Sequence, residues 1–379
     1  MRGDHAGVVQ RCGGGVQLPD SLASHMNHPN KTFAYAAHAS GAPLAPFSFE
    51  RRVPGARDVA LEILFCGICH SDIHQVRNEW GGGQYPMVPG HEIVGVVRQV
   101  GAEVGRFRVG DHVGVGCFVD SCRTCAGCRA GEEQFCAAGM VSTYNSPSRD
   151  GTGTTRGGFS SSIVVDQDYV LSIPKALPLE RAAPLLCAGI TTFSPLRQWQ
   201  VRAGTRVGIM GLGGLGHMGV KLAAAMGAKV TVLSTSAGKR ADALRLGAHE
   251  FIVTDAAGPP ASARGQFDLI LNTLSAAHDL NVYLPLLDTG GTLVLLGAPP
   301  RGPGIEPFAL IGGRRRLVGS LIGGIRETQE MLNFCAEQAV AADVETIGAP
   351  AINGAIERMM RGDVRYRFVI DAKTFLPSA

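Results

Sequence analysis

The chain has 379 residues, more than one hydrophobic core of ordinary size accommodates, and this length predicts two domains. Apolar residues make up 45% of the chain and charged residues 18%, and no apolar run approaches the length of a membrane-spanning helix. Lys and Arg number 35 against 32 Asp and Glu, so the chain lacks the broad basic surface of nucleic-acid-binding proteins. We therefore expect a soluble protein without a membrane or nucleic-acid partner.

The first thirty residues differ in composition from the rest of the chain. They contain a Gly triplet and scattered polar side chains, but no apolar stretch long enough for the core of a signal peptide. We therefore exclude residues 1–30 from the fold as a disordered extension or tag, and regard Met26 as an alternative start. Without a secretory signal the expected compartment is the reducing cytoplasm, where clustered cysteines favour metal binding over disulfides.

Short β-branched runs separated by Gly and Pro turns extend from about residue 53 to 120. Examples are DVALEILF at residues 58–65 and HEIVGVVRQVG at residues 91–101. This pattern predicts that the first of the two domains is β-rich and barrel-like.

Three motifs in different parts of the chain carry side chains that bind metals. GICHSDIH supplies Cys69, PGHEIVG supplies His91, and PLLCAGITT supplies Cys187. A catalytic zinc ion takes three protein ligands and keeps one position open, and two cysteines with one histidine form a known ligand set. A single buried Cys or His is more often a core residue, and spacing alone cannot bring these three together. This hypothesis therefore depends on the fold.

A denser group of cysteines lies in CRTCAGCRAGEEQFC, residues 122–136. The spacing C-x2-C-x2-C-x7-C, through Cys122, Cys125, Cys128 and Cys136, lets one short loop surround a tetrahedral zinc ion. Four sulfur ligands close the coordination sphere, so such an ion stabilises a folded lobe and takes no part in the chemistry. A redox-active thiol cluster and an iron–sulfur cluster are the alternatives, and the spacing favours structural zinc.

The sequence changes character from about residue 200. RVGIMGLGGLGHMGVKLAAAMGAKVTVLSTS reads as strand, glycine turn, amphipathic helix and strand, and FDLILNTL and GGTLVLLGA add buried parallel-type strands. Gly211, Gly213 and Gly216 form G-x-G-x-x-G between the first strand and the helix. Gly214 and Leu215 lie inside the motif. In this context the motif predicts a dinucleotide-binding βαβ unit whose helix N-terminus faces a pyrophosphate.

The end of the second strand of this unit indicates which dinucleotide binds. An Asp or Glu at this point would bind the ribose 2′-hydroxyl of NAD, but the chain has Ser234, Thr235 and Ser236 there. Lys239 and Arg240 follow. Hydroxyl donors and cations suit the 2′-phosphate of NADP, so NADP(H) is the expected cofactor. In the alternative interpretation the two cations only solvate the start of a helix.

Together these motifs resemble the zinc-dependent medium-chain alcohol dehydrogenases, and within them the cinnamyl alcohol dehydrogenase-like, NADP-dependent aldehyde reductases. The likeness extends from about Lys31 to Asp371. CGICHSD, VPGHEIVG, VGVGCFVDSC, the four-cysteine loop, STYNSP, PLLCAGITTFSPL, GLGGLGHMG, STS and GSLIGG fall in the family's order and spacing.

The resemblance implies an α/β fold class with a β-rich domain. A GroES-like catalytic domain would be interrupted by a Rossmann domain with a doubly wound parallel sheet. The implied boundaries are 31–184 and 325–379 for the catalytic domain, about 117–140 for its structural zinc lobe, and 185–324 for the NADP-binding domain. The active site would lie in the cleft between the two domains.

The resemblance also implies how the catalytic metal is held. Cys69, His91 and Cys187 are the implied ligands of the catalytic zinc. Glu92 would be a transient ligand during water exchange. Asp72 matches a residue that holds one of the metal ligands in place.

Further matches concern the proton, the cofactor and the substrate. Ser71 and His74 resemble the family's proton relay to solvent, in which a hydroxyl must both accept and donate a proton. His70 matches a side chain that approaches the cofactor pyrophosphate. Trp80 and Phe118 are candidates for lining the substrate pocket, although both side chains are equally suited to a core.

The expected function is that of a zinc-dependent NADP(H) alcohol dehydrogenase or aldehyde reductase. It would interconvert primary alcohols and their aldehydes, aromatic and aliphatic, with one catalytic and one structural zinc ion per chain. The family also suggests a homodimer. Two alternatives stay open: a zinc-free quinone or enone reductase on the same fold, and a binding protein whose zinc loop grips nucleic acid or a partner.

Overall fold

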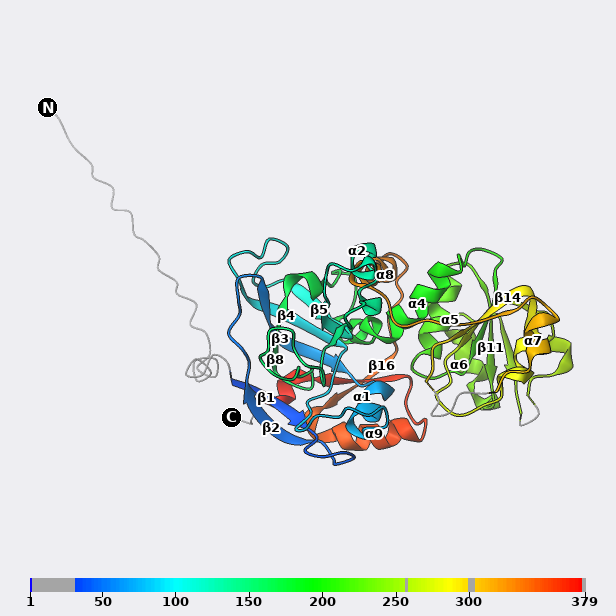
Figure 1. The fold of residues 1–379 in the computed structure, drawn as a ribbon, viewed down its shortest axis with the longest axis horizontal. Helices are drawn as coiled ribbons and strands as arrows, with labels where there is room; N and C mark the ends of the chain where they lie inside the picture. Colours follow the sequence, from blue (N-terminus) through cyan, green and yellow to red (C-terminus); the bar gives the residue numbers. More distant parts are fainter. Residues whose placement is uncertain (2–30, 256–257, 299–303, 377–379) are drawn as a thin grey trace.

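The computed structural model describes Met1 and residues 31–255, 258–298 and 304–376. Apart from Met1, the predicted extension 1–30 therefore lies outside the described residues. The chain forms two lobes side by side, one coloured mainly blue to cyan and one mainly green to yellow, and the red C-terminal segment returns to the first lobe (Figure 1). None of the helices described is both long and apolar enough to cross a membrane.

The first lobe is built on mainly antiparallel strands, with one parallel pair, β16 and β17. A seven-stranded sheet has the order β16, β17, β3, β4, β5, β9, and β8 pairs with β3 outside this path. Alternate residues of β3 from Val59 to Ile63 are buried, because this part of the run alternates larger apolar residues with Ala60 and Glu62. The strands of the sheet are β3 (Asp58–Gly67), β4 (Ile93–Val100), β5 (His112–Val115), β8 (Ser162–Asp166), β9 (Leu171–Ser172), β16 (Val344–Gly348) and β17 (Arg367–Asp371).

Smaller elements complete this lobe. Two short antiparallel pairs join β1 to β2 and β6 to β7. These elements and the helices of the lobe are β1 (Lys31–Ala36), β2 (Ala45–Glu50), β6 (Phe118–Asp120), β7 (Val141–Ser142), α1 (His70–Val76), α2 (Ala126–Ala130), α3 (Leu179–Ala182), α8 (Ile325–Glu337) and α9 (Ile352–Met360).

The second lobe is built on a six-stranded sheet in which every pairing is parallel, with the order β12, β11, β10, β13, β14, β15. The central strands β10, β11 and β13 are mostly buried apolar runs, as parallel sheets covered on both faces require, whereas the edge strand β15 has no buried residue. The elements of this lobe are β10 (Arg206–Met210), β11 (Lys229–Ser234), β12 (Glu250–Val253), β13 (Phe267–Asn272), β14 (Leu287–Leu295), β15 (Arg316–Gly319), α4 (Ala188–Gln198), α5 (Gly216–Ala225), α6 (Arg240–Arg245) and α7 (Pro307–Ile311).

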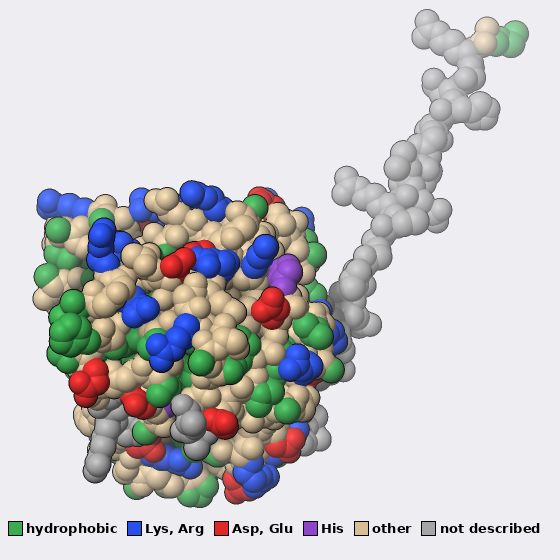
Figure 2. Space-filling view, turned by 90° about the vertical axis from the view of Figure 1, so that its right-hand side faces the viewer, with side chains coloured by type: hydrophobic (Ala, Val, Ile, Leu, Met, Phe, Trp, Pro, Cys, Tyr) green, Lys and Arg blue, Asp and Glu red, His purple; other side chains and the backbone are tan. Residues whose placement is uncertain are grey.

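The predicted fold class is confirmed: a β-rich lobe is combined with a doubly wound parallel sheet. From β10 the sheet is extended by β11 and β12 on one side and by β13, β14 and β15 on the other, so the strand order reverses at β10. Ligands bind at such a switch point. Helix α4, buried from Ala188 to Leu196, packs against α5 and α8. Seen from the parallel-sheet end, the surface carries interspersed basic and acidic side chains, and hydrophobic side chains gather at one margin (Figure 2).

Candidate active site and metal centres

A pocket of about 740 Å³ is lined by residues of both lobes. Residues 69–71 and Cys187 contribute from the side of the β-rich lobe, and residues 211–215 and 234–236 contribute from the parallel-sheet lobe. None of the described residues that line this pocket is an Asp or a Glu. The pocket therefore suits a ligand that carries negative charge.

Three segments that are far apart in the sequence meet in the wall of this pocket. Cys69 follows β3, His91 and Glu92 precede β4, and Cys187 precedes α4. One ligand atom from each of these buried residues lies within 4.8 Å of the others. The two sulfurs are 3.9 Å apart, and a tetrahedral zinc ion with Zn–S bonds of about 2.3 Å places its sulfurs about 3.8 Å apart. The four side chains therefore fit a zinc ion.

Asp72, in the first turn of α1, contacts the backbone of Cys69 and the side chain of His91. Its carboxylate accepts hydrogen bonds from the Cys69 amide (2.9 Å) and the Gly90 amide (3.0 Å), and lies 3.1 Å from Nδ1 of His91. With Nδ1 donating to the carboxylate, Nε2 of His91 keeps its lone pair for a metal. A hydrogen bond from the Cys187 thiol lowers the pKa of Cys69, which favours the thiolate that a metal requires.

Glu92 is fully buried and pairs with Arg367 of β17. Burial raises the pKa of Glu92 to about 7. Only Oε1 faces the guanidinium; Oε2 is buried and has no hydrogen-bond partner among the described residues. An orphaned carboxylate oxygen beside two sulfurs and an imidazole again fits a site that holds a cation.

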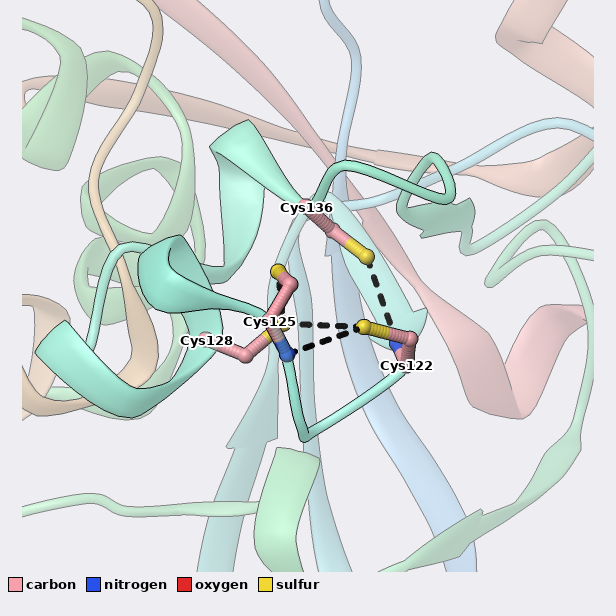
Figure 3. A group of neighbouring side chains, drawn as sticks. All are labelled: Cys122, Cys125, Cys128 and Cys136. Atoms are coloured by element: carbon pink, nitrogen blue, oxygen red, sulfur yellow. Dashed lines mark hydrogen bonds between the residues drawn. The ribbon is translucent and has the colours of Figure 1, made fainter.

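The four cysteines of the loop 122–136 converge as Figure 3 shows. The Cys128 sulfur lies 3.9 Å from that of Cys122 and 3.5 Å from that of Cys125, and the sulfurs of all four lie within 4.8 Å of one another. No disulfide joins them. These spacings fit a tetrahedral four-sulfur zinc site.

Backbone amides point at the sulfurs of this loop. The Cys122 amide donates to the Cys136 sulfur at 3.3 Å, and the Ala137 amide donates to the Cys125 sulfur at 3.4 Å. Amide hydrogen bonds from Thr124 and then Cys125 lower the pKa of Cys122 to about 5. The amides thus stabilise the thiolates of Cys122 and Cys125, the form that binds zinc, whereas burial raises the pKa of Cys128 to about 11.

The glycine loop between β10 and α5 leaves room for a phosphate. Gly211 has a φ of +87°, in the left-handed region, and a Cβ on Gly216 would collide with the Gly211 carbonyl oxygen. At Gly213, in contrast, a Cβ would meet nothing within 4 Å. That free space lies at the N-terminal end of α5, which favours negative charge. The loop therefore fits the pyrophosphate of a dinucleotide.

Of the residues expected to select NADP, four line the pocket and one does not. Ser234, Thr235, Ser236 and Lys239 line the pocket at the end of β11. Lys239 donates to the Leu212 carbonyl (2.9 Å), and burial lowers its pKa. Arg240 is exposed, lies outside the lining of the pocket, and its guanidinium stands over Phe251 at 5.2 Å.

The side chains of the expected proton relay lie along the same wall. The Ser71 hydroxyl is 3.6 Å from the Cys69 sulfur. His74 is hydrogen-bonded through Nδ1 to the Glu79 carboxylate, and its ring stacks on Trp80 with centroids 4.9 Å apart. His70 also lines the pocket, and burial lowers its pKa, so its imidazole stays neutral near pH 7.

Two parts of the chain match known families. Residues 55–175 match the alcohol dehydrogenase GroES-like domain, and residues 214–337 match the zinc-binding dehydrogenases. The chain is 60% identical over 338 residues to NADP-dependent alcohol dehydrogenase C of Mycobacterium bovis, a match that covers 89% of this chain and 97% of that protein. The chain belongs to the zinc-dependent medium-chain alcohol dehydrogenase family.

Further relatives place this dehydrogenase within the family. Aldehyde reductase YahK of Escherichia coli is 53% identical over 348 residues, 91% of this chain and 99% of that protein. The structure of CAD from Helicobacter pylori complexed with NADP(H) is similar with a TM-score of 0.86 at 44% identity, over 91% of this chain and 99% of that one. Cinnamyl alcohol dehydrogenase SbCAD4 of Sorghum bicolor gives 0.88 at 48% identity, over 90% and 98%.

This dehydrogenase is an NADP-dependent alcohol dehydrogenase or aldehyde reductase of the cinnamyl alcohol dehydrogenase type, with two zinc sites and NADP(H) as cofactor. The predicted family, reaction class and cofactors are confirmed. The zinc-free reductase and the zinc-loop binding protein lose their support, because the cluster of Cys69, His91 and Cys187 lines a pocket shared with the dinucleotide loop.

The substrate candidates from the sequence lie in different environments. Trp80 is half exposed and lines the pocket. Phe118 is only 3% exposed, packs edge-on against Tyr169, and lines a small cavity near the pocket instead of the pocket itself. A buried aromatic and a pocket aromatic are alike in sequence, so the pattern could not distinguish them.

Sequence reasoning did not single out several lining residues. Arg367 reaches the Glu92 carboxylate from the first position of β17, and its only sequence signal is a cation that begins the apolar run RFVID. Tyr144 stacks on the His91 ring with centroids 5.9 Å apart. Cys117 lines the pocket beside these groups, although it had no assigned role.

Proposed function

We propose that this pocket reduces aldehydes to primary alcohols with NADPH, and catalyses the reverse oxidation, on aromatic and aliphatic substrates. The observation that carries the proposal is the shared pocket: the cysteine and histidine cluster lines it together with the glycine loop and the serines at the end of β11. The aldehyde as substrate is supported by the names of the relatives, an aldehyde reductase and cinnamyl alcohol dehydrogenases.

Cys69, His91 and Cys187 hold the catalytic zinc in this proposal, and Glu92 is the exchangeable fourth ligand. When bound, zinc supplies Lewis acidity toward the substrate oxygen, and NADPH supplies the hydride. Arg367 draws one Glu92 oxygen away from the cluster, which leaves a ligand position for the substrate. Cys122, Cys125, Cys128 and Cys136 hold the structural zinc.

The proton that the product oxygen takes up is passed along side chains that line the pocket. Ser71 lies next to Cys69, and its hydroxyl both donates a proton to the product oxygen and accepts one in return. His74 supplies the next proton from the solvent side, where Glu79 holds its Nδ1 and Trp80 covers one face of its ring. Asp72 keeps two metal ligands in position by accepting from Cys69 and His91.

The cofactor-binding residues fall into two groups, one for the pyrophosphate and one for the 2′-phosphate. The glycine loop with its helix N-terminus, together with His70, binds the pyrophosphate, and the residues after β11 bind the 2′-phosphate. The first group is Gly211, Gly213, Gly214, Leu215 and Gly216, and the second is Ser234, Thr235, Ser236 and Lys239. Arg240, also expected from the sequence to bind the 2′-phosphate, lies outside the pocket lining and is left out of the second group. The half of the cleft lined by Trp80 is assigned to the substrate.

The domain boundaries, the homodimer and the cytoplasmic location stay predictions. Residues 31–184 and 325–379 form the catalytic domain in this proposal, and residues 185–324 the NADP-binding domain. The edge strand β15 and the exposed Phe308 (79%) and Ile311 (66%) of α7 support a dimer formed through this edge of the parallel sheet.

Steady-state reduction of a panel of aldehydes, combined with zinc analysis, tests the proposal. We expect kcat/KM with NADPH to exceed that with NADH about tenfold or more, because hydroxyls and a cation meet the 2′-phosphate. Ser236→Asp places a carboxylate there and should reverse the preference. Equal efficiency with both cofactors would remove the assigned roles of Ser234, Ser236 and Lys239.

A further inference from the structure

Part of the pocket wall comes from the segment where the chain leaves the parallel sheet. Strand β15 ends at Gly319 and helix α8 begins at Ile325. Between them, Ser320, Leu321 and Ile322 line the pocket. The position of this segment therefore affects the space that the substrate finds.

Ile322 has a strained backbone. Its φ is +38°, in the left-handed region that β-branched residues rarely adopt, and it is only 8% exposed. It lines both the pocket and the small adjacent cavity that Phe118 also lines. A strained conformation of this kind persists only where neighbouring structure holds it, so the groups that fix the residues after Ile322 matter.

The four-cysteine lobe holds the chain directly after Ile322. Gly324 lies so close to the lobe that a Cβ there would collide with the Gly131 carbonyl oxygen. Arg326 donates from Nη2 to the Ala130 carbonyl at 2.7 Å. Both contacts are made to the end of α2, the short helix that carries a cysteine of the lobe.

A third contact comes from Glu133. Its Oε2 accepts a hydrogen bond from the Ile325 amide at 3.1 Å, although the two residues are 192 positions apart in the sequence. Gly324, the N-cap of α8, has no side chain that could accept a hydrogen bond from the first amides of the helix. A carboxylate is also favoured by the dipole at a helix N-terminus. In the sequence, Glu133 lies between Cys128 and Cys136, two cysteines of the lobe.

We propose that Glu133 is a positioning residue, through which the structural zinc lobe sets the shape of the substrate end of the pocket. By capping α8 it holds Gly324 and Ile325, and these residues keep Leu321 and Ile322 in place as a wall. The structural zinc then contributes to substrate selection as well as to stability. This inference rests on the proposed aldehyde pocket.

The test compares Glu133→Gln with Glu132→Gln, which changes an exposed glutamate of the same lobe. Glu133→Gln keeps the shape of the side chain and weakens the cap. We expect the KM for a bulky aromatic aldehyde to rise about fivefold, whereas the KM values for NADPH and for a small aliphatic aldehyde change by less than about twofold. The zinc content should stay at one catalytic and one structural ion per chain.

Amide hydrogen exchange of the zinc-loaded protein without substrate measures directly how firmly the wall segment is held. Exchange in residues 320–326 should increase in Glu133→Gln and stay unchanged in Glu132→Gln. An equal change in all KM values, a response no larger than that of Glu132→Gln, or exchange that increases only in the lobe would each overturn the inference. If Glu133→Gln does not fold, Arg326→Gln removes a neighbouring contact and should change the same two readouts.

The two readouts separate this inference from the proposed function. If the wild-type chain reduces no aldehyde, the proposed function fails. The exchange measurement still decides whether Glu133 holds the wall.

Discussion

The two metal clusters of this dehydrogenase use the same sulfur chemistry but are assembled in different ways. The structural cluster comes from fifteen consecutive residues, 122–136, and two of its four cysteines are only partly buried. The catalytic cluster joins Cys69 to Cys187, which are 118 positions apart, and all of its members are buried. One site therefore needs only a local loop, and the other needs both the sheet of the first lobe and the start of α4.

The two clusters also differ in the ligands that complete the coordination of the metal. Four cysteines close the structural site, whereas the catalytic site has two cysteines, one histidine and a glutamate that Arg367 holds through one oxygen. A closed site stabilises a lobe, and a site with an exchangeable position does chemistry. Loss of a ligand should therefore have different consequences at the two sites.

The largest expected effect is that of Cys187→Ala. Removing this thiolate leaves two firm ligands for the catalytic zinc, and kcat should fall about a thousandfold because the Lewis acid is lost or misplaced. The variant should still fold and bind NADPH, which fluorescence titration of NADPH measures. Full turnover by Cys187→Ala would refute the ligand assignment.

Cys125→Ala is the matched change in the structural cluster. Since metal binding energy is part of the folding energy of the lobe, this variant should lose the structural zinc and unfold at lower temperature. The measurements are metal analysis and thermal unfolding of both variants. If Cys125→Ala were as stable as the wild type, the contrast between the two sites would not hold.

Asp72→Asn should have the next largest effect. Asp72 accepts from two backbone amides and from His91, and an amide group replaces one of its acceptors by a donor. We expect the affinity of the catalytic site for zinc, or the activity, to fall about 10- to 100-fold. Zinc content after dialysis against a chelator, compared with that of Asp363→Asn at an exposed ion pair, checks this. Equal zinc retention in the two variants would contradict it.

Acid should weaken the contact between the lobes. His217 of α5 is fully buried; its Nδ1 lies 2.8 Å from the Gly214 carbonyl, and its Nε2 accepts from the Asp343 amide at 3.3 Å. Burial lowers the pKa of His217 to about 3. This residue stays neutral in the folded state, so its contribution to stability is complete above pH about 6.5 and is lost as the pH falls toward 3.

The expected loss from His217 is about 2 kcal/mol of unfolding free energy at pH 5. His217→Gln cannot take up a proton, so its stability should decrease less between pH 7 and pH 5 than that of the wild type. Denaturant unfolding at both pH values measures the difference, and His112→Gln at an exposed site is the control. Parallel pH curves for the wild type and His217→Gln would exclude this role.

The smallest expected effect is that of Ser121→Ala beside the structural cluster. The Ser121 hydroxyl lies 3.1 Å from the Cys128 sulfur and 2.7 Å from the Tyr169 hydroxyl. Its loss should weaken zinc binding by the lobe by about 1 kcal/mol and leave kcat unchanged. Competition for zinc with a chelator, with Ser172→Ala as the control, measures the effect. A fall in kcat with zinc retained would instead link Ser121 to the chemistry.

The parts of the site that residue spacing alone predicted, without the family resemblance, each lie within a short stretch of the chain. The spacing of the four cysteines and of the three glycines of the loop lies within a few residues of chain, where local backbone geometry decides the arrangement. The parts it did not single out, such as Arg367 and Tyr144, act only through partners from distant strands. Phe118 belongs with them, since only packing separates a core aromatic from a pocket aromatic.

The amino-acid sequence by itself determined the β-rich and parallel-sheet lobes, the zinc loop, the dinucleotide turn and, through the resemblance of its motifs, the reaction class. Only the tertiary structure decided that Cys69, His91 and Cys187 meet in the wall of the pocket, that Glu92 faces Arg367, and that Glu133 caps α8. The physical reason is that alternation and spacing are properties of neighbouring residues, whereas contacts across more than a hundred positions exist only after the lobes have packed.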